Sequence, residues 1–435
     1  MSEKNQPTTS LLACETKMSK DLQTLEGLAE ISFPAQQVSD KRPTLNLAIA
    51  LDSSGSMAGT SNGISALDHA KEATMALIGR LDDNDRICIV AYSGSPMVIL
   101  ESMPVSAARN MVKQALGNVY ASGSTALHAG WLAAAQQAAP FVDQYSISRI
   151  LLLSDGQATD GMTDEKLLAA EAEKLCGAGL TTSTYGLGMY FNEQLMTGMA
   201  VGGSARYAEN ADTLIPYFEA DFSMLAQTVA RAVYLTLNAH NPDTGESLKV
   251  ELLGGGRVEN ERWRLSAGVA GASSWAAFSI NVANHTQVQI DTQWKIVDLD
   301  GSVSTLEDSS TWGRGRGRKN KAVIARISEV KAASAAEAAA QAARKGDRIA
   351  TKAHLVVLRD LAQSSAYASA VSNHLSDLEA AGNLGALAKE TAYVGSTMRS
   401  RVVDVNEQHD TLSQDRFGLR KAVQGKADND KSKSK

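Results

Sequence analysis

Three short polar segments of the sequence carry side chains that could bind a metal ion. Asp52-Ser53-Ser54-Gly55-Ser56 follows an apolar run, Ser122-Gly123-Ser124-Thr125 precedes a helical pattern, and Ser154-Asp155-Gly156 follows the apolar run RILLL. Two neighbouring carboxylates repel and raise each other's pKa, and a bound divalent cation removes that penalty. A donor set made only of oxygens suits a hard cation, Mg²⁺ or Mn²⁺. The segments supply two carboxylates and three hydroxyls for such a site, from Asp52, Ser54, Ser56, Thr125 and Asp155.

The elements that would position these segments alternate between strand and helix patterns. Apolar runs predict buried strands at 44–51, 87–93, 149–155 and 181–188. Apolar residues at helical spacing predict helices at 65–81, 107–116, 125–139, 164–176, 192–199 and 212–233. This alternation indicates a doubly wound, mostly parallel α/β domain over 43–233. In such a sheet the loops after neighbouring strands converge, so the polar segments are expected at one edge.

The three segments together resemble the metal-ion-dependent adhesion site of von Willebrand factor type A domains: Asp52-x-Ser54-x-Ser56, Thr125 in a Gly-Ser-Thr loop and Asp155 in Ser-Asp-Gly. The resemblance covers about 43–233. It implies direct metal contacts from Ser54, Ser56 and Thr125, with Asp52 and Asp155 binding directly or through water. It also implies an open metal position that an Asp or Glu of a protein partner fills.

The acidic loop at 160–165 is similar to that of bacterial relatives in the chloride-channel-like branch of these proteins. In those relatives the domain is embedded in a β-sandwich and followed by helices. The name of the branch does not imply channel activity, because the sequence has no apolar run of the roughly 18 residues that span a bilayer.

Outside 43–233, the pattern of apolar residues and the composition of the chain differ from those of the α/β domain. Period-2 segments at 234–310 predict a β-sandwich domain, to which 1–42 contributes through the stretch 21–33. The run WGRGRGRK predicts a flexible basic linker at 311–321, and the Ala-rich stretch 322–420 predicts an α-helical region with a hairpin at Lys345-Gly346-Asp347. The composition of 421–435 is typical of a disordered tail.

Composition and charge exclude several classes of protein. With 435 residues, 44% hydrophobic and 21% charged, the chain is expected to form two or three globular domains. The net charge of −6 hides an asymmetry, because the stretch from 311 to the end holds 22 basic and 13 acidic residues. Three scattered cysteines and the lack of a membrane-spanning run predict a cytoplasmic location.

These observations favour a non-enzymatic adaptor or scaffold that binds a protein partner through Mg²⁺ or Mn²⁺. One alternative is a Mg²⁺-dependent hydrolase or phosphotransferase, but the site loops offer serine hydroxyls without a paired His or Lys. Another is nucleic-acid binding through the basic C-terminal part, where no aromatic residue interleaves with the Arg-Gly run after Trp312. The identity of the partner and the oligomeric state are left open.

Overall fold

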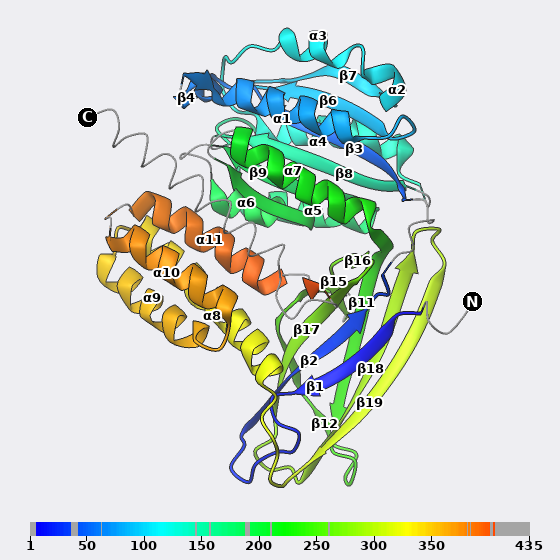
Figure 1. The fold of residues 1–435 in the computed structure, drawn as a ribbon, viewed down its shortest axis with the longest axis vertical. Coiled ribbons are helices and arrows are strands. Elements are labelled where there is room, and N and C mark those ends of the chain that lie inside the picture. Colours follow the sequence, from blue (N-terminus) through cyan, green and yellow to red (C-terminus); the bar gives the residue numbers. More distant parts are fainter. Residues whose placement is uncertain are drawn as a thin grey trace. The chain divides into compact units, whose positions relative to one another are not determined.

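The computed structural model describes residues 6–35, 42–61, 63–143, 146–155, 158–187, 192–208, 211–259, 262–380, 382, 384–400 and 403–404 (Figure 1). The chain forms two compact units. One is Lys41–Gln227, and the other joins Met1–Asp40 to Thr228–Gln414.

A six-stranded sheet forms the centre of the unit Lys41–Gln227. Its order is β10-β9-β8-β3-β6-β7, and all neighbours are parallel except the pair β6 and β7. The central strand β3 is buried along almost its whole length, as the apolar run predicts. The strands are β3 (Thr44–Asp52), β6 (Arg86–Tyr92), β7 (Pro96–Pro104), β8 (Ser146–Ser154), β9 (Leu180–Leu187) and β10 (Gly202–Ala208).

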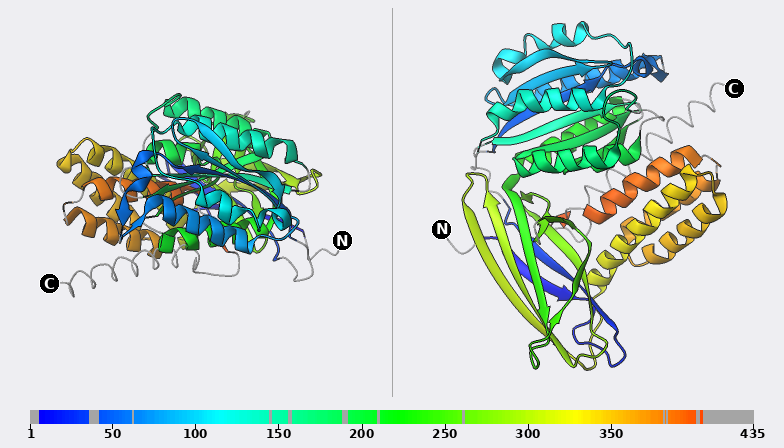
Figure 2. Two further views of the ribbon diagram at one scale, coloured as in Figure 1. Left: turned by 90° about the horizontal axis from the view of Figure 1, so that it is seen from above. Right: turned by 180° about the vertical axis from the view of Figure 1, so that it is seen from behind.

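Helices cover both faces of this sheet. The helices α1 (Ala66–Arg80) and α7 (Ala211–Ala226) lie side by side on one face, and α4 (Leu127–Ala138) and α5 (Glu165–Gly177) lie on the other (Figures 1 and 2). The predicted doubly wound α/β fold is confirmed. The shorter elements are η2 (Gly55–Ala58), β4 (Thr60–Ser61), β5 (Ile64–Ser65), α2 (Val105–Ala108), α3 (Val112–Gly117), η3 (Ala139–Phe141) and α6 (Glu193–Met199).

Two helices differ from the sequence prediction. The helix expected at 107–116 is broken into α2 and α3. The helix expected at 212–233 ends at Ala226, and strand β11 (Thr228–His240) begins two residues later in the other unit. The start of β11 alternates between buried and half-buried residues, which is the period of a strand although alanines dilute it. The α/β unit therefore ends at Gln227 rather than at Val233.

A β-sandwich of two antiparallel sheets forms part of the second unit. Strand β2 pairs with β17 over nine residues. Thr24 lies opposite Asn281 at one end of the pairing, and Ser32 lies opposite Ser273 at the other. Strands from before and after the α/β unit therefore share one sheet. The α/β unit is thus an insertion in the sandwich. That sheet runs β1-β2-β17-β13 with β20 beside β17, and the facing sheet runs β14-β15-β11-β18-β19 with β12 and β16 beside β11. The bounds are β1 (Thr8–Ala13), β2 (Thr24–Ser32), β12 (Ser247–Leu248), β13 (Val250–Gly254), β14 (Gly256–Glu259), β15 (Arg262–Leu265), β16 (Gly268–Val269), β17 (Ala272–Asn281), β18 (Gln287–Asp298), β19 (Val303–Gly313) and β20 (Val403–Asp404).

Four helices follow the sandwich in the part of the chain that the structure describes: α8 (Lys321–Arg344), α9 (Arg348–Ala362), α10 (Ala366–Ala380) and α11 (Leu384–Ser400). Gly346 between α8 and α9 has a φ of 72°, a left-handed conformation that suits glycine at the predicted hairpin turn. Val323, Ile327 and Val330 of α8 pack on Leu28, Trp275 and Ala277 of the sandwich. The predicted tail at 421–435 lies outside the described residues.

The prediction of a flexible basic linker at 311–321 is wrong. Thr311 and Trp312 belong to strand β19, which extends to Gly313, and α8 begins at Lys321. The residues between them run beside 14–18, with backbone hydrogen bonds from Thr16 N to Arg318 O (3.0 Å) and from Gly315 N to Met18 O (2.8 Å). The glycines allow two chain segments to approach each other closely here. The composition of the run alone resembles that of a flexible linker.

None of the helices in the described part of the chain has the length and apolar character that crossing a membrane requires.

Candidate metal centre

Asp52 is the last residue of the central strand β3 and is fully buried. Its Oδ1 accepts a hydrogen bond from the backbone N–H of Ser54 (2.8 Å), and its Oδ2 accepts one from the hydroxyl of Ser154 (2.6 Å). Ser154 ends the neighbouring strand β8, so the parallel register brings the two strand ends together. The carboxylate is thereby fixed at the carboxyl edge of the sheet.

The hydroxyls of Ser54 and Ser56 lie beside this carboxylate. Their Oγ atoms are 3.1 Å apart, and the Ser56 hydroxyl donates to Oδ1 of Asp155 at 2.8 Å. Ser54 is buried, Asp155 is 8% exposed and Ser56 is exposed to solvent. The chain therefore joins four of the five predicted residues through hydrogen bonds at a place that solvent reaches on one side.

Thr125 lies on a loop that packs against the same turn. The backbone N–H of Gly55 donates to Gly123 O (3.0 Å), and that of Ser122 donates to Ser53 O (2.8 Å). Thr125 itself is 5% exposed, and its N–H donates to the hydroxyl of Thr159 at 3.0 Å. These bonds hold the second polar segment next to the first, as the convergence of loops at the sheet edge predicts.

Burial raises the pKa values of both carboxylates, Asp52 and Asp155. Burial is the main cause that raises the pKa of Asp155 to about 6, and the negative charge of Asp52 adds to the rise while the Ser56 hydrogen bond opposes it. Burial also raises the pKa of Asp52, against the hydrogen bonds from Ser154 and Ser54. No basic side chain in the described part of the chain contributes to either shift.

The residues present fit a hard divalent cation. The negative charge of Asp52 raises the pKa of Asp155, and a bound cation would stabilise both carboxylates in the ionised form. Within the described ranges no group of three or more His, Cys, Asp and Glu side chains could hold a metal. A metal at this edge would therefore depend on hydroxyl oxygens and water for its remaining contacts, which suits Mg²⁺ or Mn²⁺ better than a softer ion.

Some contributions were not predicted from the sequence. Ser154 orients Asp52, and Thr159 fixes the Thr125 loop through its hydroxyl and through its N–H, which donates to Thr125 O at 3.0 Å. Ser124 donates to Asp160 at 3.2 Å at the exposed rim. The only available signal was that Ser154 and Thr159 flank Asp155 in the sequence, because their partners are set by the pairing of strands and loops. Gly156, part of the third polar segment, lies outside the described residues.

The fold and the position of the oxygen donors define a doubly wound α/β domain with a polar site at the carboxyl edge of its sheet. Residues 47–157 match the family model of the von Willebrand factor type A domain. The chain therefore contains such a domain, within the unit Lys41–Gln227.

Two curated relatives share part of the sequence. An uncharacterized protein of Synechocystis, sll0103, is 30% identical over 200 residues, which are 46% of this chain and 46% of that protein. The uncharacterized protein YfbK of Escherichia coli is 32% identical over 171 residues, which are 39% of this chain and 29% of that protein. The match thus spans less than half the length of each relative.

Two solved structures resemble most of the chain. A von Willebrand factor type A protein from Catenulispora acidiphila has a TM-score of 0.66 at 19% identity and covers 87% of this chain and 90% of its own. The ArnB paralog VWA2 from Sulfolobus acidocaldarius has a TM-score of 0.57 at 16% identity, covering 91% and 98%. At these identities the likeness concerns the fold.

Proposed function

We propose that Asp52, Ser54, Ser56, Thr125 and Asp155 form a metal-ion-dependent adhesion site for Mg²⁺ or Mn²⁺, through which the chain holds an Asp or Glu of a protein partner. The observation that carries this proposal is that two buried carboxylates, whose pKa values no basic side chain of the described residues lowers, adjoin two hydroxyls, of which that of Ser56 faces solvent. A bound metal would supply the positive charge that attracts an anionic oxygen of the partner.

The residues of the chain divide the work. Asp52 and Asp155 provide negative charge from the buried side, while the hydroxyls of Ser54 and Ser56 add neutral donors. Two ionised carboxylates balance the charge of a divalent cation without exceeding it, and the hydroxyls add no further charge. A metal held here would therefore still attract one anionic oxygen on its solvent side, which favours a carboxylate of a partner over a neutral group.

The type of domain supports an interaction role. Von Willebrand factor type A domains are commonly metal-dependent protein-interaction modules. We also propose that the chain belongs to the bacterial chloride-channel-like branch, and the insertion of the α/β unit in a β-sandwich that helices follow supports this proposal. In an adaptor or scaffold of this kind, the sandwich and helices would offer further surfaces for assembly.

The proposal is tested with the variant Asp52→Ala in the full chain. Loss of a hydrogen-bond partner of a metal ligand lowers metal affinity roughly 10- to 100-fold. Loss of the carboxylate ligand itself should lower the affinity for Mg²⁺ by more than this. Isothermal titration calorimetry measures Mg²⁺ affinity, and thermal melting with Mg²⁺ and with EDTA measures its stabilising effect. Affinity capture from the native host, with Mg²⁺ and with EDTA, then identifies partners that require both the metal and Asp52.

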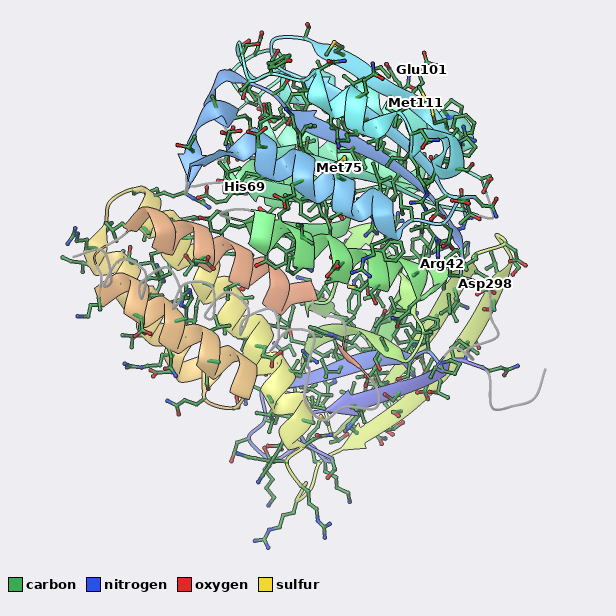
Figure 3. The ribbon with its side chains drawn as sticks, turned by 45° about the horizontal axis from the view of Figure 1, so that its top comes forward. Arg42, His69, Met75, Glu101, Met111 and Asp298 are labelled. Carbon is green, nitrogen blue, oxygen red and sulfur yellow. The ribbon has the colours of Figure 1, made fainter. Side chains whose placement is uncertain are left out.

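The matched control is Glu101→Gln, which removes a carboxylate charge from the exposed edge strand β7 (Figure 3). It should bind Mg²⁺ and the captured partner as the natural protein does. A well-folded Asp52→Ala protein with undiminished Mg²⁺-dependent partner binding would contradict the metal-bridge proposal.

A further inference from the structure

Two segments that are distant in the sequence pair at the start of α8. Residues 14–20 follow β1, and residues 313–321 connect β19 to α8. Backbone hydrogen bonds join Asn320 N to Cys14 O (2.8 Å), Thr16 N to Arg318 O (3.0 Å) and Met18 N to Gly313 O (3.0 Å). We call this pair of segments, residues 14–20 and 313–321, the basic ribbon.

The basic ribbon is held in a defined conformation. The Arg314 guanidinium is turned inward, where it donates to the backbone carbonyls of Ser19 (2.6 Å), Leu22 (2.9 Å), Val282 (2.5 Å) and His285 (2.9 Å). At Gly317, a Cβ atom would lie 2.6 Å from Lys17 O and 2.7 Å from Lys17 N. Only glycine therefore allows the two segments to approach this closely. The Arg-Gly run is thus a packing device as well as a source of charge.

Six basic side chains remain exposed on this ordered support. None of them forms an ion pair with any residue that the structure describes; they are Lys17, Lys20, Arg316, Arg318, Lys319 and Lys321. The two segments contain one acidic residue, Glu15, which is half-buried. The N-terminus of α8 lies at Lys321, so the positive end of a 24-residue helix adds to the same field.

The basic ribbon has no exposed apolar side chain, which excludes ligands that bind through apolar contact. Its apolar side chains are Cys14 and Met18, which are half-buried and fully buried, and the structure describes every residue of the ribbon. There is thus no exposed aromatic ring on which a base of a single strand could stack, and no exposed large apolar side chain to enter a bilayer. A ligand must be recognised by its charge.

We propose that the basic ribbon binds the phosphate backbone of double-stranded nucleic acid without reading its sequence. A duplex carries one negative charge per roughly 1.7 Å of its axis, so several phosphates can lie within reach of the exposed Lys and Arg side chains of the basic ribbon. The major groove of a B-form duplex is wide enough to admit a two-stranded ribbon. The guanidinium groups of Arg316 and Arg318 suit bidentate contact with phosphate.

The test uses the full chain and a short fluorescently labelled DNA duplex of random sequence, with EDTA present, and measures fluorescence anisotropy at several salt concentrations. If five of the six cations neutralise phosphates, log K should fall against log salt with a slope of about −4 to −5. The variant Arg316→Ala/Arg318→Ala should bind more weakly and reduce the magnitude of the slope by about 2. Thermal melting should show that this variant is folded, because both side chains are exposed.

The matched control is Lys113→Ala/Lys166→Ala, which removes two exposed charges from the α/β unit and should bind the duplex normally. Asp52→Ala should also bind it normally, so this inference and the proposed metal site can fail separately. The inference is overturned if Arg316→Ala/Arg318→Ala retains the affinity and slope of the natural protein. It is equally overturned if phosphatidylserine vesicles or poly-glutamate bind the ribbon and the duplex does not.

Discussion

At Asp52, burial opposes the charged form of the carboxylate and two hydrogen bonds favour it. Burial raises the pKa of Asp52, while the bonds from the Ser154 hydroxyl and the Ser54 N–H act in the opposite direction. Ser154 therefore does two things for a metal site: it orients the carboxylate and favours the ionised form that a cation requires. Ser154 is a positioning residue in this arrangement.

Ser154→Ala should lower Mg²⁺ affinity about 10- to 100-fold, which is the usual effect of removing a hydrogen-bond partner from a metal ligand. Calorimetric titration with Mg²⁺ measures the effect directly. Ser154→Thr should restore part of the affinity because it keeps the hydroxyl.

Ser148→Ala is the matched control, because Ser148 lies on the same strand, is 2% exposed and accepts a hydrogen bond from Asn46 (3.0 Å). It should lower stability without weakening Mg²⁺ binding. Equal losses of Mg²⁺ affinity in Ser148→Ala and Ser154→Ala would show that the effect comes from general destabilisation.

The sequence was most informative about residues that follow strands. The order of the polar segments and the apolar run before each of two of them predicted which side chains meet at the sheet edge. Hydrogen bonds link Ser54 to Ser56 and Ser56 to Asp155, across almost a hundred residues of chain. The roles of Ser154 and Thr159 could not be predicted, because they depend on which strand lies beside β3 and on how two loops pack.

Among the secondary-structure elements, the basic ribbon and β11 were the places where local pattern misled. Glycine and arginine at 313–318 have the composition of a solvated linker, but long-range pairing with 14–18 decides their conformation. In β11 the alanines permit either a helix or a strand, and pairing with β18 over ten residues, ending at His240 and Gln289, decides for the strand. Tertiary contacts override propensity in both cases.

Arg314→Ala tests whether the inward arginine holds the ribbon together. Its guanidinium donates to carbonyls of two loops, so truncation would remove the donor of the Leu22 and His285 carbonyls, while those of Ser19 and Val282 keep a backbone N–H donor. The expected loss in the free energy of unfolding is about 3 kcal/mol, which lowers the Tm of a unit of this size by roughly 6–12 °C. Differential scanning calorimetry of the full chain measures this loss for the sandwich transition.

Arg316→Ala is the control for that experiment, since Arg316 is two residues away, exposed and free of ion pairs with the described residues. Its Tm should stay within about 1–2 °C of that of the natural protein, as expected for a surface substitution. If Arg314→Ala were equally harmless, the segment would be the unstructured linker that its composition resembles.

At the scale of the whole molecule, composition predicted several domains and the patterns predicted their classes, but the insertion depended on one pairing. The ends of the interrupted sandwich meet at the same place. A Cβ atom on Gly268 would lie 2.5 Å from the ring of Phe33, and Thr228 pairs with Val269. Strand β2 therefore ends beside the start of β11, where an inserted unit can leave and return without disturbing the sheets.

This geometry predicts how fragments of the chain fold. A fragment of residues 228–404 lacks β1 and β2, so β17 would lose the partner with which it pairs over nine residues and become an edge strand. The core would also lose Leu25 and Ile31, both buried. We expect this fragment to aggregate or to melt without a cooperative transition in circular dichroism.

Joining residues 6–35 to it through a short Gly-Ser linker in place of the α/β unit should restore cooperative melting, because Phe33 and Thr228 adjoin the same strand. Residues 41–227 alone should melt cooperatively as well, since that unit has its own core. If the fragment 228–404 melted cooperatively at the temperature of the joined protein, the N-terminal strands would be an accessory to the sandwich and the insertion would have no role in its folding.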